Sequence, residues 1–198
     1  MTILSVPLFP LQTVLFPGGP LSLRVFEPRY LDMVSRCMQN DEPFGVVLLV
    51  EGAEVTTKVI TQATGTLAAI TDWYQGADGL LGLTATGGSR FRLITMRCQD
   101  DGLNIGDIEV LPPEPQVPVP GYFVHMTEIL QSLLDDIGGT YEDISRDFDD
   151  ASWVGYRFAE ILPIEKEQKQ YCLELDDPLA RLEFLYPFLR PVSENQAS

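Results

Sequence analysis

Few of the side chains that catalytic sites require occur in this chain of 198 residues. It holds one histidine, His125, and three lysines, Lys58, Lys166 and Lys169. A single histidine excludes Ser-His-Asp and Cys-His sites unless His125 serves in one, and its place between apolar positions of a predicted helix indicates a surface residue. No lysine follows a glycine-rich loop of the kind that binds phosphates in ATP-driven enzymes. We therefore expect no catalytic site and no cofactor.

Cysteines and long apolar runs are scarce as well. Cys37, Cys98 and Cys172 are odd in number and far apart, which argues against a disulfide framework or a zinc site and favours reduced thiols in the core. No apolar run approaches the roughly 18 residues that cross a bilayer. No basic residue precedes Arg24, as one would in a secretory signal. The sequence thus predicts a soluble, cytoplasmic protein with no membrane contact.

Positive charge is in short supply, because 13 Lys and Arg residues face 29 Asp and Glu residues, for a net charge of −16. Residues 1–100 carry seven basic against nine acidic residues, whereas residues 101–198 carry six against twenty. Such a chain would repel a polyanion, so we expect no nucleic-acid partner. The acidic residues between 135 and 150 lack the alternating ligands with a glycine at a fixed place that a calcium loop needs, and we interpret them as a solvated linker without a metal ion.

The first hundred residues predict mainly short strands. Strands are expected over the ranges 21–25, 44–50, 55–60, 65–73, 80–86 and 90–97. The glycine-rich range 86–90 is interpreted as a hairpin turn between two of them. One helix is expected from Pro28 to about Gln39, where the apolar residues recur at helical spacing. Several short strands in succession favour a closed or partly closed barrel.

Prolines punctuate both ends of this region. Pro7 and Pro10 each remove a backbone donor, so we expect no unbroken central strand near the N-terminus. The range 17–20, Pro-Gly-Gly-Pro, predicts a turn. Five prolines between 112 and 120 predict a stiff, extended connector.

Beyond the connector the apolar period changes from two to 3.6 residues. Helices are expected over 122–137, 152–162, 165–175 and 177–189, with Asp149 or Asp150 and Asp177 as caps. The predicted fold class is therefore α+β, a β-barrel over 1–112 with one inserted helix, followed by a small α-helical bundle over 118–190. Residues 191–198 are expected to form a flexible tail.

Three segments in this order resemble a known family. They are Pro7-Leu8-Phe9-Pro10, Phe16-Pro17-Gly18 and Phe26-Glu27-Pro28-Arg29-Tyr30, and looser matches continue to about residue 190. The pattern is similar to the N-terminal domain of ATP-dependent Lon proteases, their substrate-recognition module. The resemblance implies a PUA-like β-pseudobarrel with a C-terminal helical subdomain. Since neither the ATPase nor the protease motif of Lon occurs in the sequence, it predicts a stand-alone, non-catalytic form without peptidase activity.

The resemblance implies a module that recognises unfolded or extended protein segments. Because PUA-like barrels often bind RNA, RNA binding is the alternative, and the net charge of −16 argues against it. Trp73 and Tyr74, beside a polar turn, are candidate anchors for a peptide, although burial of Trp73 in the core is an equal alternative.

Four further residues are candidates for the same binding surface. Arg24, Glu27 and Arg29 are interpreted either as a polar lip on a groove or as a charge network that fixes the turn from strand to helix. Phe16 is a candidate contact, with burial in the core as the alternative, an alternative that extends to Phe26 and Tyr30.

Overall fold

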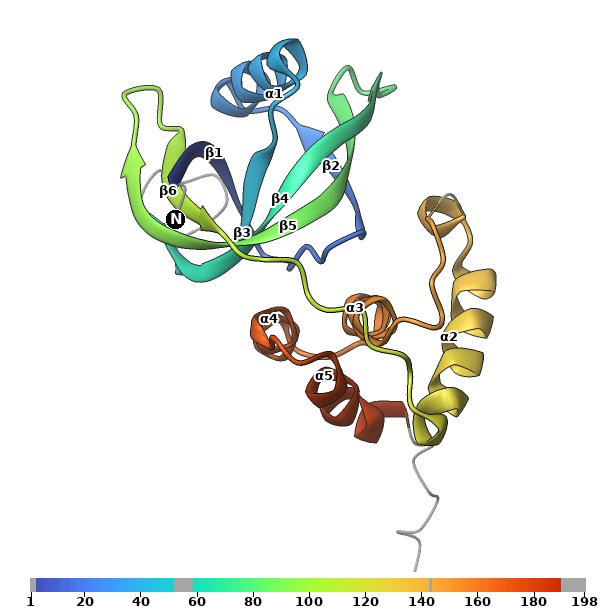
Figure 1. Cartoon of the computed structure of the whole chain (residues 1–198). Coiled ribbons are helices and arrows are strands. Elements are labelled where there is room, and N and C mark those ends of the chain that lie inside the picture. The colour runs from blue at the N-terminus through green and yellow to red at the C-terminus, as the bar shows by residue number, and fades with distance from the viewer. Residues whose placement is uncertain (1–2, 52–58, 143, 190–198) are drawn as a thin grey trace, which may run out of the picture.

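The computed structural model describes residues 3–51, 59–142 and 144–189, and it shows an α+β chain with strands first and helices last (Figure 1). The strands are β1 (Ile3–Leu11), β2 (Pro20–Val25), β3 (Phe44–Glu51), β4 (Ile60–Gln75), β5 (Leu81–Cys98) and β6 (Asn104–Val110). The helices are α1 (Pro28–Asn40), α2 (Val124–Ile137), α3 (Ala151–Ile161), α4 (Lys166–Glu174) and α5 (Pro178–Leu185). Short 3-10 turns lie at Gly121–Phe123, Gly139–Tyr141 and Tyr186–Leu189.

The six strands form a barrel. Their order is β2-β5-β4-β3-β1-β6, and a further pairing of β5 with β6 closes the sheet on itself. The long strand β5 makes the closure possible, because its first half pairs with β2 and its second half with β6. Helix α1 covers one end of the barrel (Figure 1) and buries Tyr30, Met33 and Val34 in the barrel core.

Strand β1 corrects the prediction that prolines would prevent an unbroken central strand. It runs through Pro7 and Pro10 and has neighbours on both sides, β6 antiparallel and β3 parallel. The two pairings overlap only at Leu8, so that Pro7 lies opposite β6 alone and Pro10 opposite β3 alone. Each proline therefore needs to fit one neighbour, and its missing donor interrupts no second ladder.

Strand β5 corrects the prediction of a hairpin turn over 86–90. The strand is continuous, and its glycines serve a close approach of two chain segments. A β-carbon on Gly87 would collide with the carbonyl oxygen of Phe16. Instead, Gly87 exchanges backbone hydrogen bonds with Gly18 (2.7 Å) and Gly19 (2.8 Å). Gly18 has a φ of 69°, which confirms the turn predicted over 17–20.

Parts of two further predictions lie outside the described residues. Strand β4 begins at Ile60, and of the strand expected over 55–60 the range 55–58 is not among the described residues. The expected tail over 191–198 also lies outside them. Cys37 and Cys172 are buried free thiols, whereas Cys98 is exposed, so its predicted place in the core is wrong.

The predicted helices are confirmed, and side chains cap the N-terminal ends of α3, α4 and α5. Asp150 accepts hydrogen bonds from the first amides of α3, and Asp177 does the same for α5. Helix α4 begins with a capping box between Glu165 and Gln168. Helix α3 packs against α2, α4 and α5 and is the centre of the helical part.

The core of the helical part extends into the barrel. Its buried cluster joins Phe158 of α3 and Leu182 of α5 to Val14, Phe16 and Leu48 of the barrel region. The proline-rich connector runs over the same joint, where Val119 donates to the carbonyl oxygen of Asp149 at 2.9 Å. The two parts therefore share packed surface, while the division at 112–118 stays a prediction.

Candidate functional site

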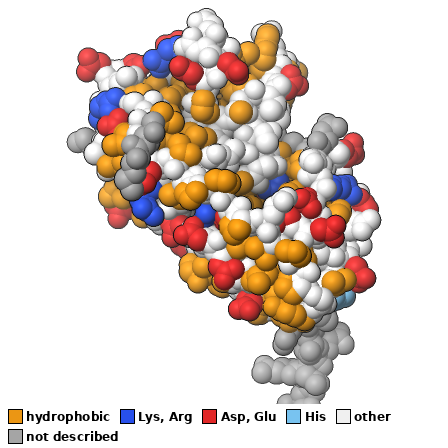
Figure 2. Space-filling view, in the orientation of Figure 1, with side chains coloured by type: hydrophobic (Ala, Val, Ile, Leu, Met, Phe, Trp, Pro, Cys, Tyr) orange, Lys and Arg blue, Asp and Glu red, His pale blue; other side chains and the backbone are white. Residues whose placement is uncertain are grey.

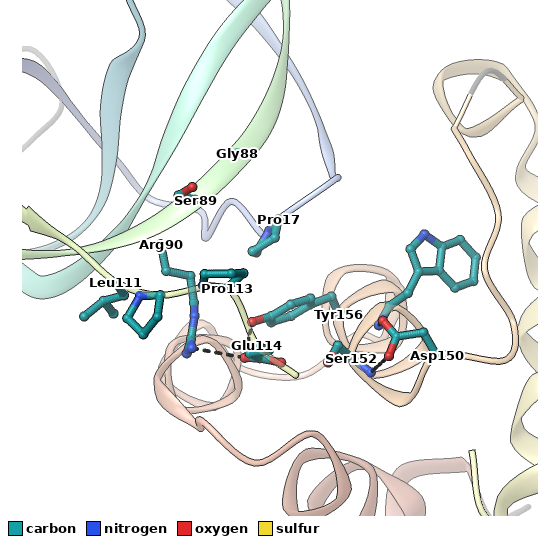
Figure 3. Close-up of a pocket in the computed structure, with 12 residues that line it drawn as sticks. Pro17, Gly88, Ser89, Arg90, Leu111, Pro113, Glu114, Asp150, Ser152 and Tyr156 are labelled. Atoms are coloured by element: carbon teal, nitrogen blue, oxygen red, sulfur yellow. Dashed lines mark hydrogen bonds and ion pairs between the residues drawn. The ribbon is translucent and has the colours of Figure 1, made fainter. Parts of the chain in front are cut away.

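A cleft of about 270 Å³ lies where the barrel, the connector and α3 meet (Figure 3). Its lining residues come from all three: Pro17, Gly88, Ser89, Arg90, Leu111, Pro112, Pro113, Glu114, Asp150, Ser152, Trp153 and Tyr156. Asp150 is engaged as the cap of α3, at 3.1 Å from the backbone nitrogen of Trp153. The cleft marks the joint between the two parts, and its polar groups largely bind one another.

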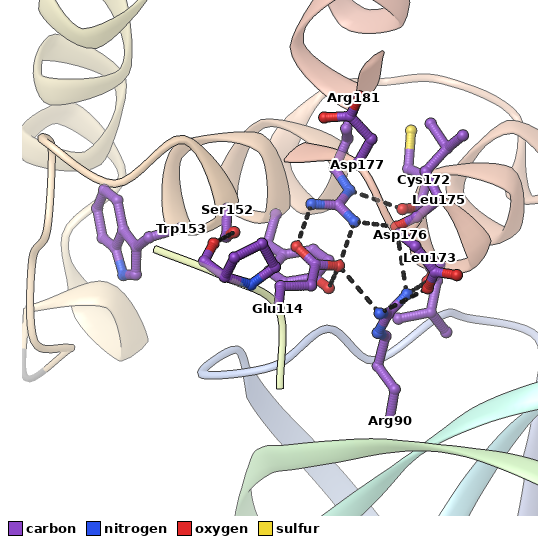
Figure 4. A network of polar contacts seen from close by, with 12 residues as sticks. Arg90, Glu114, Ser152, Trp153, Cys172, Leu173, Leu175, Asp176, Asp177 and Arg181 are labelled. Carbon is purple, nitrogen blue, oxygen red and sulfur yellow. Dashed lines mark hydrogen bonds and ion pairs between the residues drawn. The ribbon is translucent and has the colours of Figure 1, made fainter. Parts of the chain in front are cut away.

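Glu114 is the centre of a buried network of charges at this joint (Figure 4). Its two carboxylate oxygens accept hydrogen bonds from Arg181 at 2.6 and 2.9 Å, and Arg90 lies 3.2 Å from one of them. The side chains of all three are at most 5% exposed. Tyr156 donates its hydroxyl to Glu114, and burial raises the pKa of that hydroxyl, which keeps it protonated as a donor.

The two arginines of this network also bind the end of α4. Arg90 donates to the carbonyl oxygen of Leu173 at 2.8 Å, and Arg181 donates to that of Cys172 at 2.7 Å. The last carbonyl groups of a helix have no partner within the helix, and guanidinium groups satisfy them well. The network thus joins β5, the connector, α4 and α5 in one arrangement.

A second buried tie connects α3 to the turn before β2. The guanidinium of Arg157 is fully buried and donates to the carbonyl oxygens of Pro17 and Gly18, each at 2.8 Å. Glu160 lies 3.4 Å from it. Burial raises the pKa of Glu160 to about 7, an effect that Arg157 and a hydrogen bond from Tyr141 partly offset. These contacts hold the two parts of the molecule together.

Two larger clefts continue from the joint along the barrel. One of about 590 Å³ shares Trp153 with the first cleft and extends along β4 and β5 to Thr71 and Asp72. The next, of about 440 Å³, shares Thr71 and Asp72 and ends between β4 and the C-terminal end of α1. Figure 2 shows hydrophobic side chains on both the barrel and the helical part, with acidic side chains among them. The three clefts thus adjoin one another through shared lining residues.

Trp73 and Tyr74 lie on the projecting hairpin between β4 and β5. They are 56% and 51% exposed, so the alternative of Trp73 in the core is wrong. Tyr74 lies over Gly82 of β5, where a β-carbon would collide with its ring. Trp73 instead lines the 440 Å³ cleft. Both aromatic rings are therefore accessible to solvent.

Phe16 and Phe26 differ in burial. Phe16 is fully buried against Tyr156, with ring centroids 5.7 Å apart, so its place in the core is confirmed and a ligand would not reach it in this arrangement. Phe26 is 57% exposed, which contradicts its predicted burial. It lines a small cleft of about 180 Å³ beside β2 and Tyr30.

The three charged candidates do not act as one group. Arg29 is buried and binds Glu27 at 2.8 Å and the carbonyl oxygen of Gly102 at 2.8 Å. That pair fixes the turn from β2 to α1, as the charge-network interpretation predicts. Arg24 is exposed and pairs with Asp78 in the β4–β5 turn, at 3.0 Å. Of these three residues, only Arg24 is therefore exposed.

Sequence reasoning missed the network at the joint. Glu114 follows two prolines in an exposed-looking connector, and its partners Arg90, Tyr156 and Arg181 are all remote from it in sequence. One signal was available: Arg157 and Arg181 lie within the apolar faces of α3 and α5, where an unpaired charge would be costly. Such positions predict buried ion pairs, although not which carboxylate completes them.

No group of three or more His, Cys, Asp or Glu side chains among the described residues is arranged to hold a metal ion. His125 lies at the surface, as predicted, 3.6 Å from Glu128. Asp135, expected in the acidic linker, lies instead in the last turn of α2 and pairs with Arg146 at 2.6 Å. No helix in the described ranges is long and apolar enough to cross a bilayer.

Two solved structures share this arrangement. A Lon N-terminal domain protein from Xanthomonas campestris matches 95% of this chain and 100% of its own, with a TM-score of 0.79 and 36% identity. The N-terminal domain of the Mycobacterium avium complex Lon protease matches 93% of this chain and 97% of its own, with a TM-score of 0.64. At 15% identity, the second likeness shows the fold alone.

Curated relatives include protein cereblon. The Xenopus tropicalis protein is 28% identical over 117 residues, and the Gallus gallus protein is 27% identical over 108. These matches cover 59% and 54% of this chain but 26% and 24% of the cereblons, so the chain spans about a quarter of the length of these relatives.

The model of one protein family matches nearly all of the chain. It describes the substrate-binding domain of ATP-dependent protease La (LON) and matches residues 5–190, which include both the barrel and the helical part. The chain therefore belongs to the LON substrate-binding domain family.

Proposed function

We propose that this protein binds unfolded or extended protein segments along the barrel and the cleft to the helical part, and that it does so without a catalytic step. The observation that carries the proposal is the exposure of large aromatic side chains on the barrel, Phe26, Trp73 and Tyr74, each more than half accessible. Exposed apolar groups beside clefts are typical of surfaces that bind other proteins. Membership of a substrate-binding family supports the same conclusion.

The many contacts at the joint support this role. Contacts from Glu114, Arg157 and Gln170 hold the helical part against the barrel, and Gln170 donates to the carbonyl oxygen of Thr64 at 3.0 Å. A preformed surface loses little conformational entropy when a ligand binds. The bound segment supplies the flexibility, and contact through aromatic rings makes few demands on its sequence.

RNA binding, the alternative, has less support. Arg24, Arg92, Arg97 and Arg146 are exposed or partly exposed, and each pairs with a carboxylate. Phosphate groups would have to displace these acids in a chain of net charge −16. We place the protein in the cytoplasm, where the free thiols of Cys37 and Cys172 would stay reduced.

Binding of a permanently unfolded protein tests the proposal. A disulfide-bonded protein that has been reduced and treated with iodoacetamide is labelled and titrated by fluorescence anisotropy, with its native form as control. We expect the unfolded form alone to bind, and the double variant W73A/Y74A to weaken binding at least fivefold. Tyr122→Ala removes a ring that is 66% exposed from the helical part and should have no effect.

Flat titrations with several unfolded proteins would contradict the proposed function. Equal losses of affinity from W73A/Y74A and from Y122A would show that Trp73 and Tyr74 are not part of the binding surface. Turnover of a fluorogenic peptide that persists through repurification would contradict the absence of catalysis.

A further inference from the structure

Strand β4 has a free edge on the projecting hairpin. Its pairing with β3 ends where Phe44 meets Ala68, but β4 continues to Gln75 and pairs there with β5 alone. Among the described strands, none lies beside residues 69–75 on the side that β3 has left. Figure 1 shows this hairpin projecting from the barrel beside α1. A free strand edge carries unpaired N–H and C=O groups, which are a template for another strand.

The 440 Å³ cleft opens onto this edge. Five consecutive residues of β4, 69–73, line it. Successive side chains of a strand point to opposite faces, so a cleft that meets all five meets the strand from its edge. The opposite wall comes from the end of α1 and the turn after it, with Met38, Asp41 and Pro43. A guest strand in the cleft would pair with β4 beyond the point where the pairing of β4 with β3 ends.

One backbone group of this edge has a hydrogen-bond partner within β4 itself. The N–H of Trp73 donates to the side chain of its neighbour Asp72, at 2.8 Å. A carboxylate that holds an edge amide in this way protects a free edge from uncontrolled pairing. The carbonyl oxygen of a guest strand would replace the Asp72 carboxylate as the acceptor for the Trp73 N–H. The charged carboxylate of Asp72 would then be free of this bond.

The charged residues that line the cleft are all acidic. Asp41, Glu42 and Asp72 line it, no basic residue does, and none of the three takes part in an ion pair of the described residues. Apolar contact comes from Met38 and Trp73, which are 41% and 56% exposed. The complementary ligand has an extended backbone, apolar side chains and positive charge.

We propose that the free edge of β4 is a strand-addition site for extended protein segments that carry Lys or Arg beside apolar residues. The inference rests on the proposed function and names its ligand class and its place. Main-chain hydrogen bonds to residues 69–75 supply affinity that is independent of sequence. The carboxylates of Asp41, Glu42 and Asp72 supply the preference for basic segments.

Three labelled peptides test the proposal on the full chain by fluorescence anisotropy. The first alternates Lys and Val over eight residues, the second has Glu for each Lys, and the third is the first with alternate backbone nitrogens methylated. We expect the lysine peptide to bind at least tenfold tighter than either of the others. It should also slow hydrogen exchange of the Trp73 amide.

A pair of matched variants separates this site from general attraction by an acidic protein. The triple variant D41N/E42Q/D72N should reduce affinity for the lysine peptide at least fivefold. E128Q/E167Q/E183Q removes the same charge from the exposed surface of the helical part and should change affinity less than twofold. Asparagine also tolerates the left-handed conformation of Asp41, which has a φ of 55°.

The outcomes are distinguishable. Equal binding of the lysine and glutamate peptides, or equal effects of the two triple variants, would overturn the charge preference and leave the proposed function standing. Unchanged binding of the methylated peptide would overturn strand addition. If neither these peptides nor an unfolded protein binds, the proposed function fails as well.

Discussion

Glu114 lies in a buried network of charges at the joint. Its buried carboxylate faces two guanidinium groups, Arg90 from the barrel and Arg181 from α5, together with the hydroxyl of Tyr156. Burial of charges is tolerated only when each has its partners, and here every member depends on the others. A glutamate among prolines gives no sign of this in the sequence, because its partners lie 24 and 67 residues away. The local sequence therefore does not predict a role that depends on distant partners. It does predict the helix caps Asp150 and Asp177, because a cap and the amides it binds are neighbours in sequence.

Glu114→Gln should be strongly destabilising. The substitution preserves volume but leaves Arg181 buried without a counter-charge and Arg90 with only the exposed carboxylate of Asp176, which costs about 3–5 kcal/mol of unfolding free energy. Urea denaturation followed by circular dichroism measures the loss. Glu109→Gln is the control, because Glu109 lies 3.9 Å from an Arg92 that is 61% exposed, and such pairs contribute below about 1 kcal/mol. Similar losses in both variants would show that the network is not a structural tie.

Elements were predicted well where their causes are local and poorly where they are not. The helices follow from apolar spacing and from caps that lie within a few residues of each end. The strands depend on partners far along the chain. The passage of β1 through Pro7 and Pro10 depends on which neighbour stands opposite each proline, and the continuity of β5 depends on its contact with Phe16. A glycine-rich run has the same local signature in a turn and at a close approach.

The adjacent glycines of β5 allow a matched test of that explanation. Gly87→Ala would press a methyl group against the carbonyl oxygen of Phe16, and we expect a loss of about 1–3 kcal/mol. Gly88→Ala meets its nearest described atom, the carbonyl oxygen of Leu67, at 3.4 Å and should change stability by less than about 0.5 kcal/mol. Urea midpoints of the two variants provide the measurement. A larger loss for G88A than for G87A would contradict the close approach of β5 and Phe16.

At the scale of the whole molecule, the barrel and the helices depend on a common core. Val14, Phe16 and Leu48 belong to the same buried cluster as the helical residues, and Arg157 and Gln170 bind backbone carbonyls of the barrel region. The change of period beyond the connector predicted both parts, and the fold class is correct. The change of period could not predict how the two parts attach to each other. A hydrophobic pattern shows which face of an element is buried but not which residues cover that face.

The shared core predicts that the two parts unfold together. Opening of the helical part alone would expose Phe16 and Leu48 and would break the contacts of Arg90 with Leu173 and of Arg157 with Pro17, so it should cost nearly as much as global unfolding. Native-state hydrogen exchange in increasing urea measures the opening free energies of amides in β3 and α3. We expect the two to agree within about 1 kcal/mol. If α3 opens at a much lower free energy than β3, the ranges 1–112 and 118–190 are independent folding units, and the binding surface between them is adjustable rather than preformed.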